Sequence, residues 1–275
     1  MTVGGKKIYY RGYYNLKAII EALKTDHGMN KATEVILTGG SAGGAATFIH
    51  ADQIASMLPN TVKRYKASPF SGMFLRHANV ENRAVYETQL KHVFEMQNCT
   101  YGVDSHCIAN KKAADRHLCM FGQENIKTTM TPMFVFNSMY DAWSLRCIMT
   151  AEPVAASSSN AYNCSAAPGW YNCVEHESCS KTQFNELNSK WGYDYNELVK
   201  SDSGLKNRGN GLFAYSCHYH VAELGYWNKI QINKVTMREA FMKWYNSNNE
   251  DAAKHTYIDC TINGNFLCNP TCAAK

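Results

Sequence analysis

Short apolar runs recur along the chain, and stretches with a helical hydrophobic period separate them. Strands are predicted at the apolar runs 35–38, 132–137 and 212–215, and a further short strand at residues 66–70. Helices are predicted where apolar residues recur every three or four positions, at residues 13–24, 45–58, 80–97, 183–200 and 235–245. This alternation predicts an α/β fold with a mostly parallel sheet and helices on both faces.

Three segments fall outside the alternation. Residues Ile8 to Tyr10 predict the end of a short strand. Residues 150–180, rich in alanine, serine, asparagine and cysteine, predict a long excursion from the fold, and the tail after the last helix predicts a cysteine-rich loop. Neither an internal repeat nor a linker composition interrupts the chain, so we expect one domain over residues 1–275 that contains the excursion.

The pentapeptide Gly39-Gly40-Ser41-Ala42-Gly43 lies between the first buried strand and the helix that follows it. A strand, a Gly-x-Ser-x-Gly turn and a helix together form the nucleophile elbow of α/β-hydrolases. The turn is crowded, so the residues two before and two after the serine must be small, as Gly39 and Gly43 are. The helix N-terminus favours negative charge near the Ser41 hydroxyl. Such turns also occur without chemistry, but the strand and helix around this one favour catalysis.

Two further predicted strands end beside residues that complete a catalytic set. Asp141 follows the third strand, and His218 and His220 both follow the fourth. A serine hydroxyl needs a base within hydrogen-bond reach, and a histidine base needs a buried carboxylate that orients it. Ser41, Asp141 and a histidine also stand in the chain order of α/β-hydrolases. The pattern leaves a helix N-cap as the other role of Asp141, and it does not decide between the two histidines.

Composition excludes several classes of protein. With 275 residues the chain is long enough for one large α/β domain, and 45% hydrophobic and 19% charged residues are an ordinary globular balance. The net charge is +5, and the lysines and arginines form no basic stripe, so nucleic-acid binding is not expected. Because no apolar run reaches about eighteen residues, no membrane span is expected.

Eleven cysteines are a high count for this length. Most fall into three groups with short spacings: Cys99, Cys107 and Cys119; Cys164, Cys173 and Cys179; Cys260, Cys268 and Cys272. Since the chain has no Cys-x-x-Cys pair, disulfides are favoured over zinc, and a secreted protein over a cytosolic one. The odd count leaves at least one free thiol, for which Cys147 and Cys217, outside the groups, are the candidates.

Signals of secretion disagree with one another. Glycosylation sequons at residues 98–100 and 163–165 agree with an extracellular, cell-wall location, although each carries a cysteine in its middle position. The segment from Met1 to Lys7, in contrast, contains no apolar core of a signal peptide. Either the cysteines mislead, or the true N-terminus is missing.

A series of sequence blocks follows in one order along nearly the whole chain. The blocks are Ile8–Gly12, Leu37–Gly44, Asn98–Thr100, Leu118–Phe121, Thr131–Trp143, Ser216–His220, Tyr257–Cys260 and Cys268–Cys272. In this order they resemble the pectin acetylesterase family, whose animal relative is the carboxylesterase Notum. The Ser-Ala-Gly-Gly block and the Asn-Ser-x-Tyr-Asp-x-Trp block are specific in combination, and the tail is more similar to the plant-type members.

The resemblance implies that Ser41 is the nucleophile and Asp141 the acid. It places the base on His220 rather than on His218. The residues expected around the oxyanion and the substrate are Ala42, Gly40 and Trp143. Members of the family hydrolyse O-acyl esters without a cofactor or metal, and their substrates are acetyl groups on pectin or a fatty acyl group on a signalling protein.

The chain departs from the family before the elbow. Members carry a signal peptide, early strands and a Gly-Gly-Gly-Trp loop with oxyanion-hole donors, and this chain starts after that loop. An N-terminally incomplete product is therefore expected, in which the Ala42 N–H remains as one donor; a lost donor costs about a hundred- to a thousandfold in rate. Residues 70–72 also replace an Asp-Ala-Gly-like segment, so the pocket wall is expected to differ.

Three hypotheses follow from the sequence. The first is a secreted, monomeric serine esterase that removes acetyl groups from an acetylated cell-wall polysaccharide such as pectin. The second is a Notum-like esterase for a longer acyl chain, which needs a deep apolar pocket. The third is a non-catalytic carbohydrate-binding relative, because the oxyanion-hole loop is absent.

Overall fold

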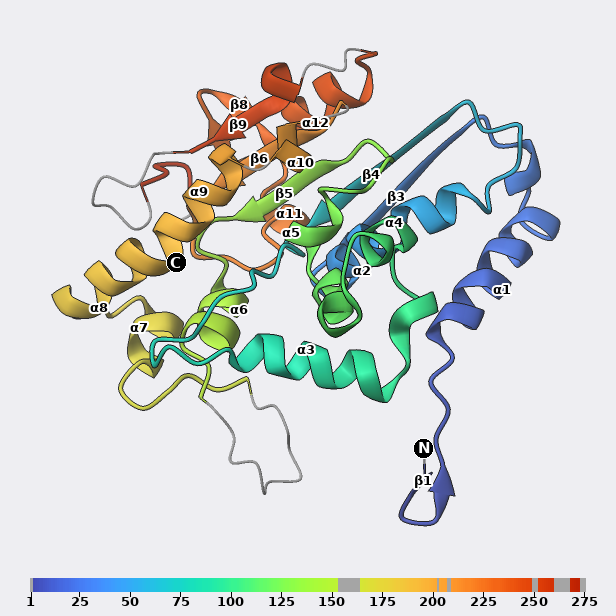
Figure 1. The fold of residues 1–275 in the computed structure, drawn as a ribbon. Coiled ribbons are helices and arrows are strands. Elements are labelled where there is room, and N and C mark those ends of the chain that lie inside the picture. Colours follow the sequence, from blue (N-terminus) through green and yellow to red (C-terminus); the bar gives the residue numbers. More distant parts are fainter. Residues whose placement is uncertain are drawn as a thin grey trace.

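A parallel five-stranded sheet forms the centre of the fold in the computed structural model (Figure 1). The structure describes residues 2–152, 164–201, 203–206, 209–248, 252–259 and 268–272. The strands lie in the order β3 (Glu34–Gly40), β4 (Arg64–Phe70), β5 (Phe134–Ser138), β6 (Gly211–Tyr215) and β9 (Thr256–Ile258). Two antiparallel pairs lie outside it: β1 (Thr2–Val3) with β2 (Lys6–Lys7), and β7 (Gln231–Ile232) with β8 (Val235–Thr236).

The strand register brings the segments after four strands to one edge of the sheet. β3 and β4 pair along their whole length, so that Gly40 stands opposite Phe70. β5 and β6 also end in register, with Ser138 opposite Tyr215. Since all neighbours in the sheet are parallel, the segments that follow β3, β4, β5 and β6 leave the sheet in the same direction.

Both faces of the sheet are buried at its central strands β5 and β6, which explains why these two strands are rich in apolar residues. Met133 and Val135 point into one core cluster, whereas Phe134 and Phe136 point into another. Successive side chains of a strand lie on opposite faces, so β5 contributes to both clusters. A sheet covered on both faces is the arrangement that the sequence pattern predicts.

Twelve α-helices are described around the sheet. They are α1 (Gly12–Thr25), α2 (Ala42–Ala55), α3 (Val85–Met96), α4 (Ser105–Ala109), α5 (Gly122–Asn125), α6 (Ala142–Ser144), α7 (Tyr171–His176), α8 (Lys181–Glu186), α9 (Tyr193–Ser201), α10 (Ser203–Lys206), α11 (Glu223–Tyr226) and α12 (Met237–Tyr245). Short 3₁₀ segments cover Met29–Lys31, Cys99–Tyr101, Ala113–Met120 and Ala252–His255, and π-helical segments cover Leu145–Met149 and Leu187–Gly192.

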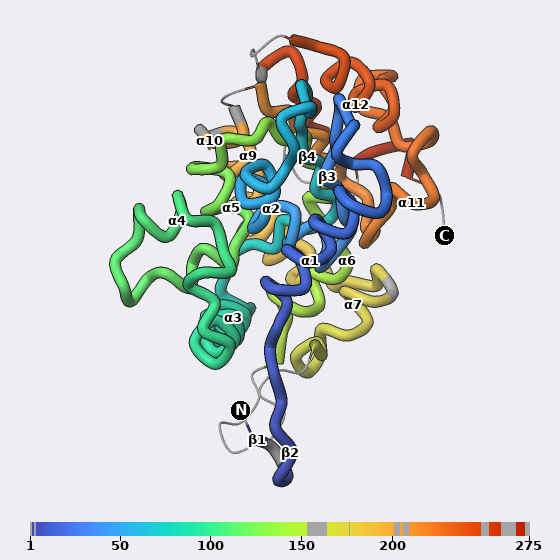
Figure 2. Tube along the Cα trace, turned by 90° about the vertical axis from the view of Figure 1, so that its right-hand side faces the viewer, coloured from blue at the N-terminus to red at the C-terminus, as the bar shows by residue number. Residues whose placement is uncertain are grey.

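Helices cover the two faces as separate layers. Phe48 of α2, Tyr86 of α3 and Val199 of α9 belong to the cluster on one face. Met237 and Trp244 of α12 belong to the cluster on the other face. Figure 1 shows α12 across the sheet from α2 and α3, and Figure 2 shows the N-terminal hairpin standing away from the body of the molecule.

Several elements differ from the prediction. Residues Ile8 to Tyr10 form no strand and lie exposed between β2 and α1, because no neighbouring strand pairs with them. Strand β9 was not predicted, since three residues in a cysteine-rich tail give no period. The predicted helix at 183–200 is interrupted by the π-helical segment Leu187–Gly192. The helix predicted from residue 235 begins two residues later, because Thr236 caps α12 in a capping box with Glu239.

The disulfides correct the prediction about the free thiol. The pairs in which both cysteines are described are Cys107–Cys119, Cys147–Cys164, Cys173–Cys179 and Cys217–Cys272. Cys147 and Cys217 are therefore bonded, and the cysteine with a free thiol in the described part of the chain is Cys99. Isolation in sequence was a poor guide, because the loop after residue 150 and the C-terminal tail return to these two positions.

Two sequence-based predictions fall partly outside the described residues. The structure does not describe residues 153–163, which include much of the predicted excursion and the asparagine of the second sequon. The remainder of the excursion contains α7 and an isolated bridge between Ala151 and Ala166. Among the described helices, none is long and apolar enough to cross a membrane.

Candidate active site

Ser41 occupies a strained turn at the end of β3. Its backbone angles are φ 56° and ψ −120°, in a region that side chains other than glycine rarely adopt. A Cβ atom on Gly39 would lie 2.5 Å from the carbonyl carbon of Gly43, and one on Gly44 would lie 2.4 Å from the carbonyl oxygen of Phe70. A Cβ on Gly43 itself would meet nothing within 4 Å, so the steric requirement falls on Gly39 and Gly44 rather than on Gly43.

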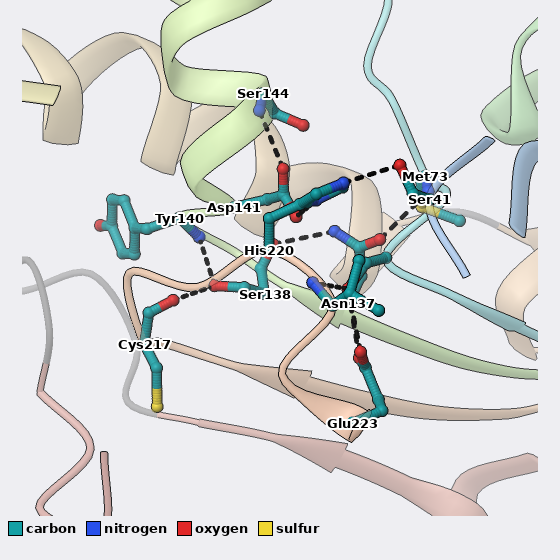
Figure 3. A network of polar contacts seen from close by, with 12 residues as sticks. Ser41, Met73, Asn137, Ser138, Tyr140, Asp141, Ser144, Cys217, His220 and Glu223 are labelled. Atoms are coloured by element: carbon teal, nitrogen blue, oxygen red, sulfur yellow. Dashed lines mark hydrogen bonds and ion pairs between the residues drawn. The ribbon is translucent and has the colours of Figure 1, made fainter. Parts of the chain in front are cut away.

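The structure brings Ser41, His220 and Asp141 into one hydrogen-bonded chain (Figure 3). His220 Nε2 lies 2.7 Å from the Ser41 hydroxyl oxygen, and His220 Nδ1 lies 2.7 Å from Asp141 Oδ2. These side chains come from loops after β3, β5 and β6, which end at the same edge of the sheet. The arrangement allows the imidazole to take the serine proton while the carboxylate holds the opposite ring nitrogen.

Asp141 makes contacts that fit both of the roles that the sequence left open. Its Oδ1 accepts the backbone N–H of Ser144 at 2.8 Å and so caps α6, while its Oδ2 holds His220. The residue is 1% exposed, so water does not compete for these oxygens. The N–H of Ala142 also donates to the carbonyl of Tyr219 at 3.3 Å, which ties the acid-bearing loop to the histidine-bearing loop.

His218 lies away from the serine. Its Nδ1 lies 3.0 Å from the carboxylate of Glu177, and the residue is buried. The two histidines are separated by one residue and have different partners, Glu177 for His218 and Ser41 for His220. The geometry thus places His220, and not His218, beside Ser41.

A cavity of about 460 Å³ opens beside the serine. Ser41, Ala42 and Trp143 line it together with Phe74 and Tyr86. The ring of Trp143 lies 4.6 Å from that of Phe74 and 5.7 Å from that of Tyr86, centroid to centroid. The aromatic wall makes this an apolar space next to the nucleophile.

Polar atoms enter this cavity at few points. His50 of α2 lines it, and burial lowers the pKa of this imidazole, which favours its neutral form. His50 Nδ1 lies 3.1 Å from the side-chain oxygen of Gln53. Gly40, which the sequence placed with Ala42 and Trp143, instead lines a second cavity of about 310 Å³ beside Val221.

Of the aromatic wall, Trp143 was expected from the resemblance, but Phe74 and Tyr86 were not. Phe74 lies in an irregular segment after β4, which carries no period, and Tyr86 lies on the inner face of α3. Their apolar character was visible, but apolar residues of this kind usually mark the core. Phe74 and Tyr86 are seen to line a cavity only in the structure, where the loop after β5 places Trp143 against them.

One cluster among the described residues has the spacing of a metal site. It consists of Asp52, Asp104 and His106. Asp52 is already occupied, because its two oxygens accept the backbone N–H groups of Met130 and Thr131, each at 2.8 Å. The carboxylate of Asp52 therefore links α2 to the loop before β5 by hydrogen bonds, and the cluster does not touch the serine site.

Comparison with known proteins shows the family of the chain. The profile of the Pectinacetylesterase family matches residues 2–273. Pectin acetylesterase 11 of Arabidopsis thaliana is 27% identical over 274 residues, covering 98% of this chain and 64% of the relative. Pectin acetylesterase 5 of the same plant is 28% identical, with coverage of 98% and 58%. Palmitoleoyl-protein carboxylesterase notum2 of Xenopus laevis is 23% identical, with coverage of 90% and 48%.

Solved structures show the same fold. The Wnt deacylase Notum from Drosophila, in two crystal forms, matches with TM-scores of 0.70 and 0.72 at 18% and 20% sequence identity. The matches cover 97% of this chain and 66% and 67% of the Notum chains. The predicted α/β-hydrolase-like fold is thus confirmed, and the chain spans less than two thirds of the length of the curated relatives.

Proposed function

The chain belongs to the pectinacetylesterase family, and from this premise we propose that it is a serine ester hydrolase that removes O-acetyl groups from pectin or a related cell-wall polysaccharide. The observation that carries the proposal is the continuous hydrogen-bonded chain from the Ser41 hydroxyl through His220 to the buried carboxylate of Asp141, with 2.7 Å at each link. A hydroxyl, an imidazole and a carboxylate in this order are the groups that acyl transfer to serine requires.

In the first half-reaction, Ser41 Oγ attacks the ester carbonyl carbon while His220 Nε2 takes the hydroxyl proton. Asp141 accepts the hydrogen bond from Nδ1 and stabilises the imidazolium. Ala42 is the first residue of α2, so its N–H has no partner within the helix and is available to the oxyanion. The bond between the carbonyl carbon and the sugar oxygen then breaks, and the sugar hydroxyl leaves with the proton from His220.

In the second half-reaction, water replaces the sugar. His220 takes a proton from the water, and the resulting hydroxide attacks the acyl group on Ser41. The bond to Ser41 Oγ breaks, the serine recovers its proton from His220, and acetic acid leaves and gives up its proton to the solvent as acetate. Each proton that His220 accepts is returned within the same half-reaction, so the cycle needs no other reagent than water.

Hydrolysis of p-nitrophenyl acetate by the parent and by Ser41→Ala tests this proposal, with circular dichroism as the check on folding. We expect release of p-nitrophenol by the parent and none above background by the variant. Equal rates for two folded proteins would refute the assignment of Ser41. A folded parent that binds pectin but hydrolyses no ester would favour a carbohydrate-binding relative instead.

The aromatic cavity favours a second function, an esterase for a longer acyl chain. A space of about 460 Å³ beside Ser41 exceeds what an acetyl group fills, and its wall of Trp143, Phe74 and Tyr86 is apolar. Burial of each methylene contributes about 0.8 kcal/mol, so kcat/KM would rise about fourfold per methylene until the cavity is full. A series from p-nitrophenyl acetate to octanoate distinguishes the two functions, because a pectin acetylesterase prefers the shortest member.

We propose an extracellular location for the protein. Four disulfides among the described residues support it, because such bonds persist in oxidising compartments. Purification without reductant and titration of free thiols under denaturing conditions test this statement. Reactive thiols at all of these cysteines would contradict it.

A further inference from the structure

Two residues beside the serine site hold strained backbone conformations like that of Ser41. Ser71, directly after β4, has a φ of 45°, and Val221, directly after His220, has a φ of 58°. A positive φ is unusual for any residue except glycine, and more so for a β-branched one. Such a conformation persists only where the surrounding contacts hold it. Val221 thus needs an anchor, and its position next to His220 makes that anchor relevant to the imidazole.

The anchor of Val221 is the side chain of Ser71. The Val221 N–H donates to the Ser71 hydroxyl oxygen at 3.1 Å. The side chain of Val221 also packs against the elbow, since a Cβ on Gly40 would lie 3.2 Å from its Cγ1. Ser71 itself is fully buried, and its own N–H donates to the carbonyl of Phe136 at 2.8 Å, so it stands on the rigid sheet.

A buried carboxylate orients the Ser71 hydroxyl. Glu223, on α11, is 7% exposed, and its two oxygens lie 3.1 and 3.2 Å from Ser71 Oγ. A hydroxyl has one proton to give. When that proton points to the carboxylate, the lone pairs of Ser71 Oγ remain for the N–H of Val221. Figure 3 shows Glu223 at the lower end of the polar network that contains His220.

The groups around Glu223 set its ionisation. Burial, with a smaller contribution from the nearby charge of Asp141, raises the pKa of the Glu223 carboxyl to about 7. Hydrogen bonds from its own N–H, from the Tyr215 hydroxyl at 3.1 Å and from Ser71 act in the opposite direction. The phenol of Tyr195 also interacts electrostatically with the Glu223 carboxylate. The proposed reaction gives Glu223 no step of its own.

We propose that Ser71 and Glu223 are positioning residues for His220: the ionised Glu223 carboxylate fixes the direction of the Ser71 hydroxyl, and Ser71 then holds the Val221 backbone that carries the imidazole to Ser41. The inference rests on the proposed function, since it describes how the base of that reaction is held. Protonation of Glu223 replaces a charge-assisted hydrogen bond by a neutral one of about half the strength. The Ser71 proton is then free to turn toward the Val221 amide, and the anchor weakens.

Kinetics over a range of pH distinguishes positioning from a structural role. In the parent, log(kcat/KM) for p-nitrophenyl acetate shows an inflection of about tenfold on the acid side, from protonation of Glu223. Glu223→Gln, which keeps the shape and cannot ionise, lacks that inflection. Ser71→Ala lowers kcat by about ten- to a hundredfold with KM nearly unchanged, because the substrate contacts remain.

Ser68→Ala is the matched control. Ser68 lies on β4, three residues before Ser71, and is equally buried. Its hydroxyl donates to the carbonyl of Phe134 at 3.0 Å, away from the histidine loop. Both variants lose one buried hydroxyl, but the control loses only the bond to Phe134, whereas Ser71→Ala loses the bond to Glu223 and the bond from the Val221 N–H. We expect it to retain the kcat and the pH profile of the parent. Equal kcat values for Ser71→Ala and Ser68→Ala would overturn the inference.

An NMR measurement separates this inference from the proposed function. The downfield Nδ1–H resonance of His220, assigned by its absence in His220→Gln, reports whether the imidazole is held on Asp141 without any turnover. It should be sharp in the parent and in Ser68→Ala, and broadened or lost in Ser71→Ala. A parent inert toward esters that shows this pattern refutes the function and keeps the positioning role. An active parent whose resonance is unchanged in Ser71→Ala refutes the positioning role and keeps the function.

Discussion

Replacement of Glu223 by glutamine should make the unfolding free energy less dependent on pH. Burial raises the pKa of this carboxyl from 4.5 to about 7, so the folded state holds one more proton than the unfolded state between these values. Because the folded state holds the extra proton, the unfolding free energy falls as pH rises from 4.5 to 7. Above pH 7 the contribution of this proton to stability is lost. A difference of about 2.5 pKa units corresponds to about 3 kcal/mol.

Urea denaturation of the parent and of Glu223→Gln at pH 4.5, 5.5, 7 and 8 measures this effect. The difference between the two proteins cancels every other titration that they share. We expect the difference in unfolding free energy between the two proteins to shift by about 3 kcal/mol in favour of the glutamine variant between pH 4.5 and pH 8. Tyr215→Phe removes a donor from the carboxylate and should extend the window above pH 7. A difference that stays constant with pH would refute the reasoning, because Glu223 would then titrate alike in both states.

Three further changes test the elbow, the tail and the cavity. Gly72→Ala puts a Cβ 2.3 Å from the carbonyl carbon of Gly44, so thermal melting should show a loss of at least about 1–3 kcal/mol; an unchanged melt contradicts the close approach. Alanine at both Cys217 and Cys272 frees a loop of 55 residues and should lower the unfolding free energy in urea by about 4 kcal/mol. Equal midpoints would oppose that pairing. Trp143→Ala removes part of the cavity wall and should reduce kcat/KM for p-nitrophenyl butyrate about threefold to tenfold more than for the acetate. A uniform loss over the ester series would place acyl chains elsewhere.

The sequence was informative where local pattern and tertiary role coincide. The strand before Ser41 and the helix after it were predicted because a buried strand and a glycine-rich turn have strong local signals. Asp141 and the segment with His218 and His220 were expected near Ser41 because parallel strands bring their following loops to one edge. The choice between His218 and His220 needed the structure or the resemblance, since both follow the same strand.

Other features depend on contacts that no local pattern encodes. Cys147 and Cys217 appeared isolated because their partners lie in segments that return from elsewhere. Strand β9 is three residues long and exists because β6 offers an edge. Glu223 lies in an ordinary Ala-Glu-Leu-Gly stretch, and nothing in its neighbours indicates that Ser71 and Tyr215 bury its carboxylate. Burial of single polar groups of this kind follows from packing alone.

Release of acetate from acetylated pectin by the parent and by Ser41→Ala tests the central claim most directly. Both proteins are checked for the same circular dichroism spectrum, and acetate is measured over time at equal protein concentration. The account predicts steady release by the parent and none above background by Ser41→Ala, since the variant lacks the oxygen that takes up the acetyl group. Equal release by the two proteins, or no release by a folded parent, would contradict the assignment of this site to pectin deacetylation.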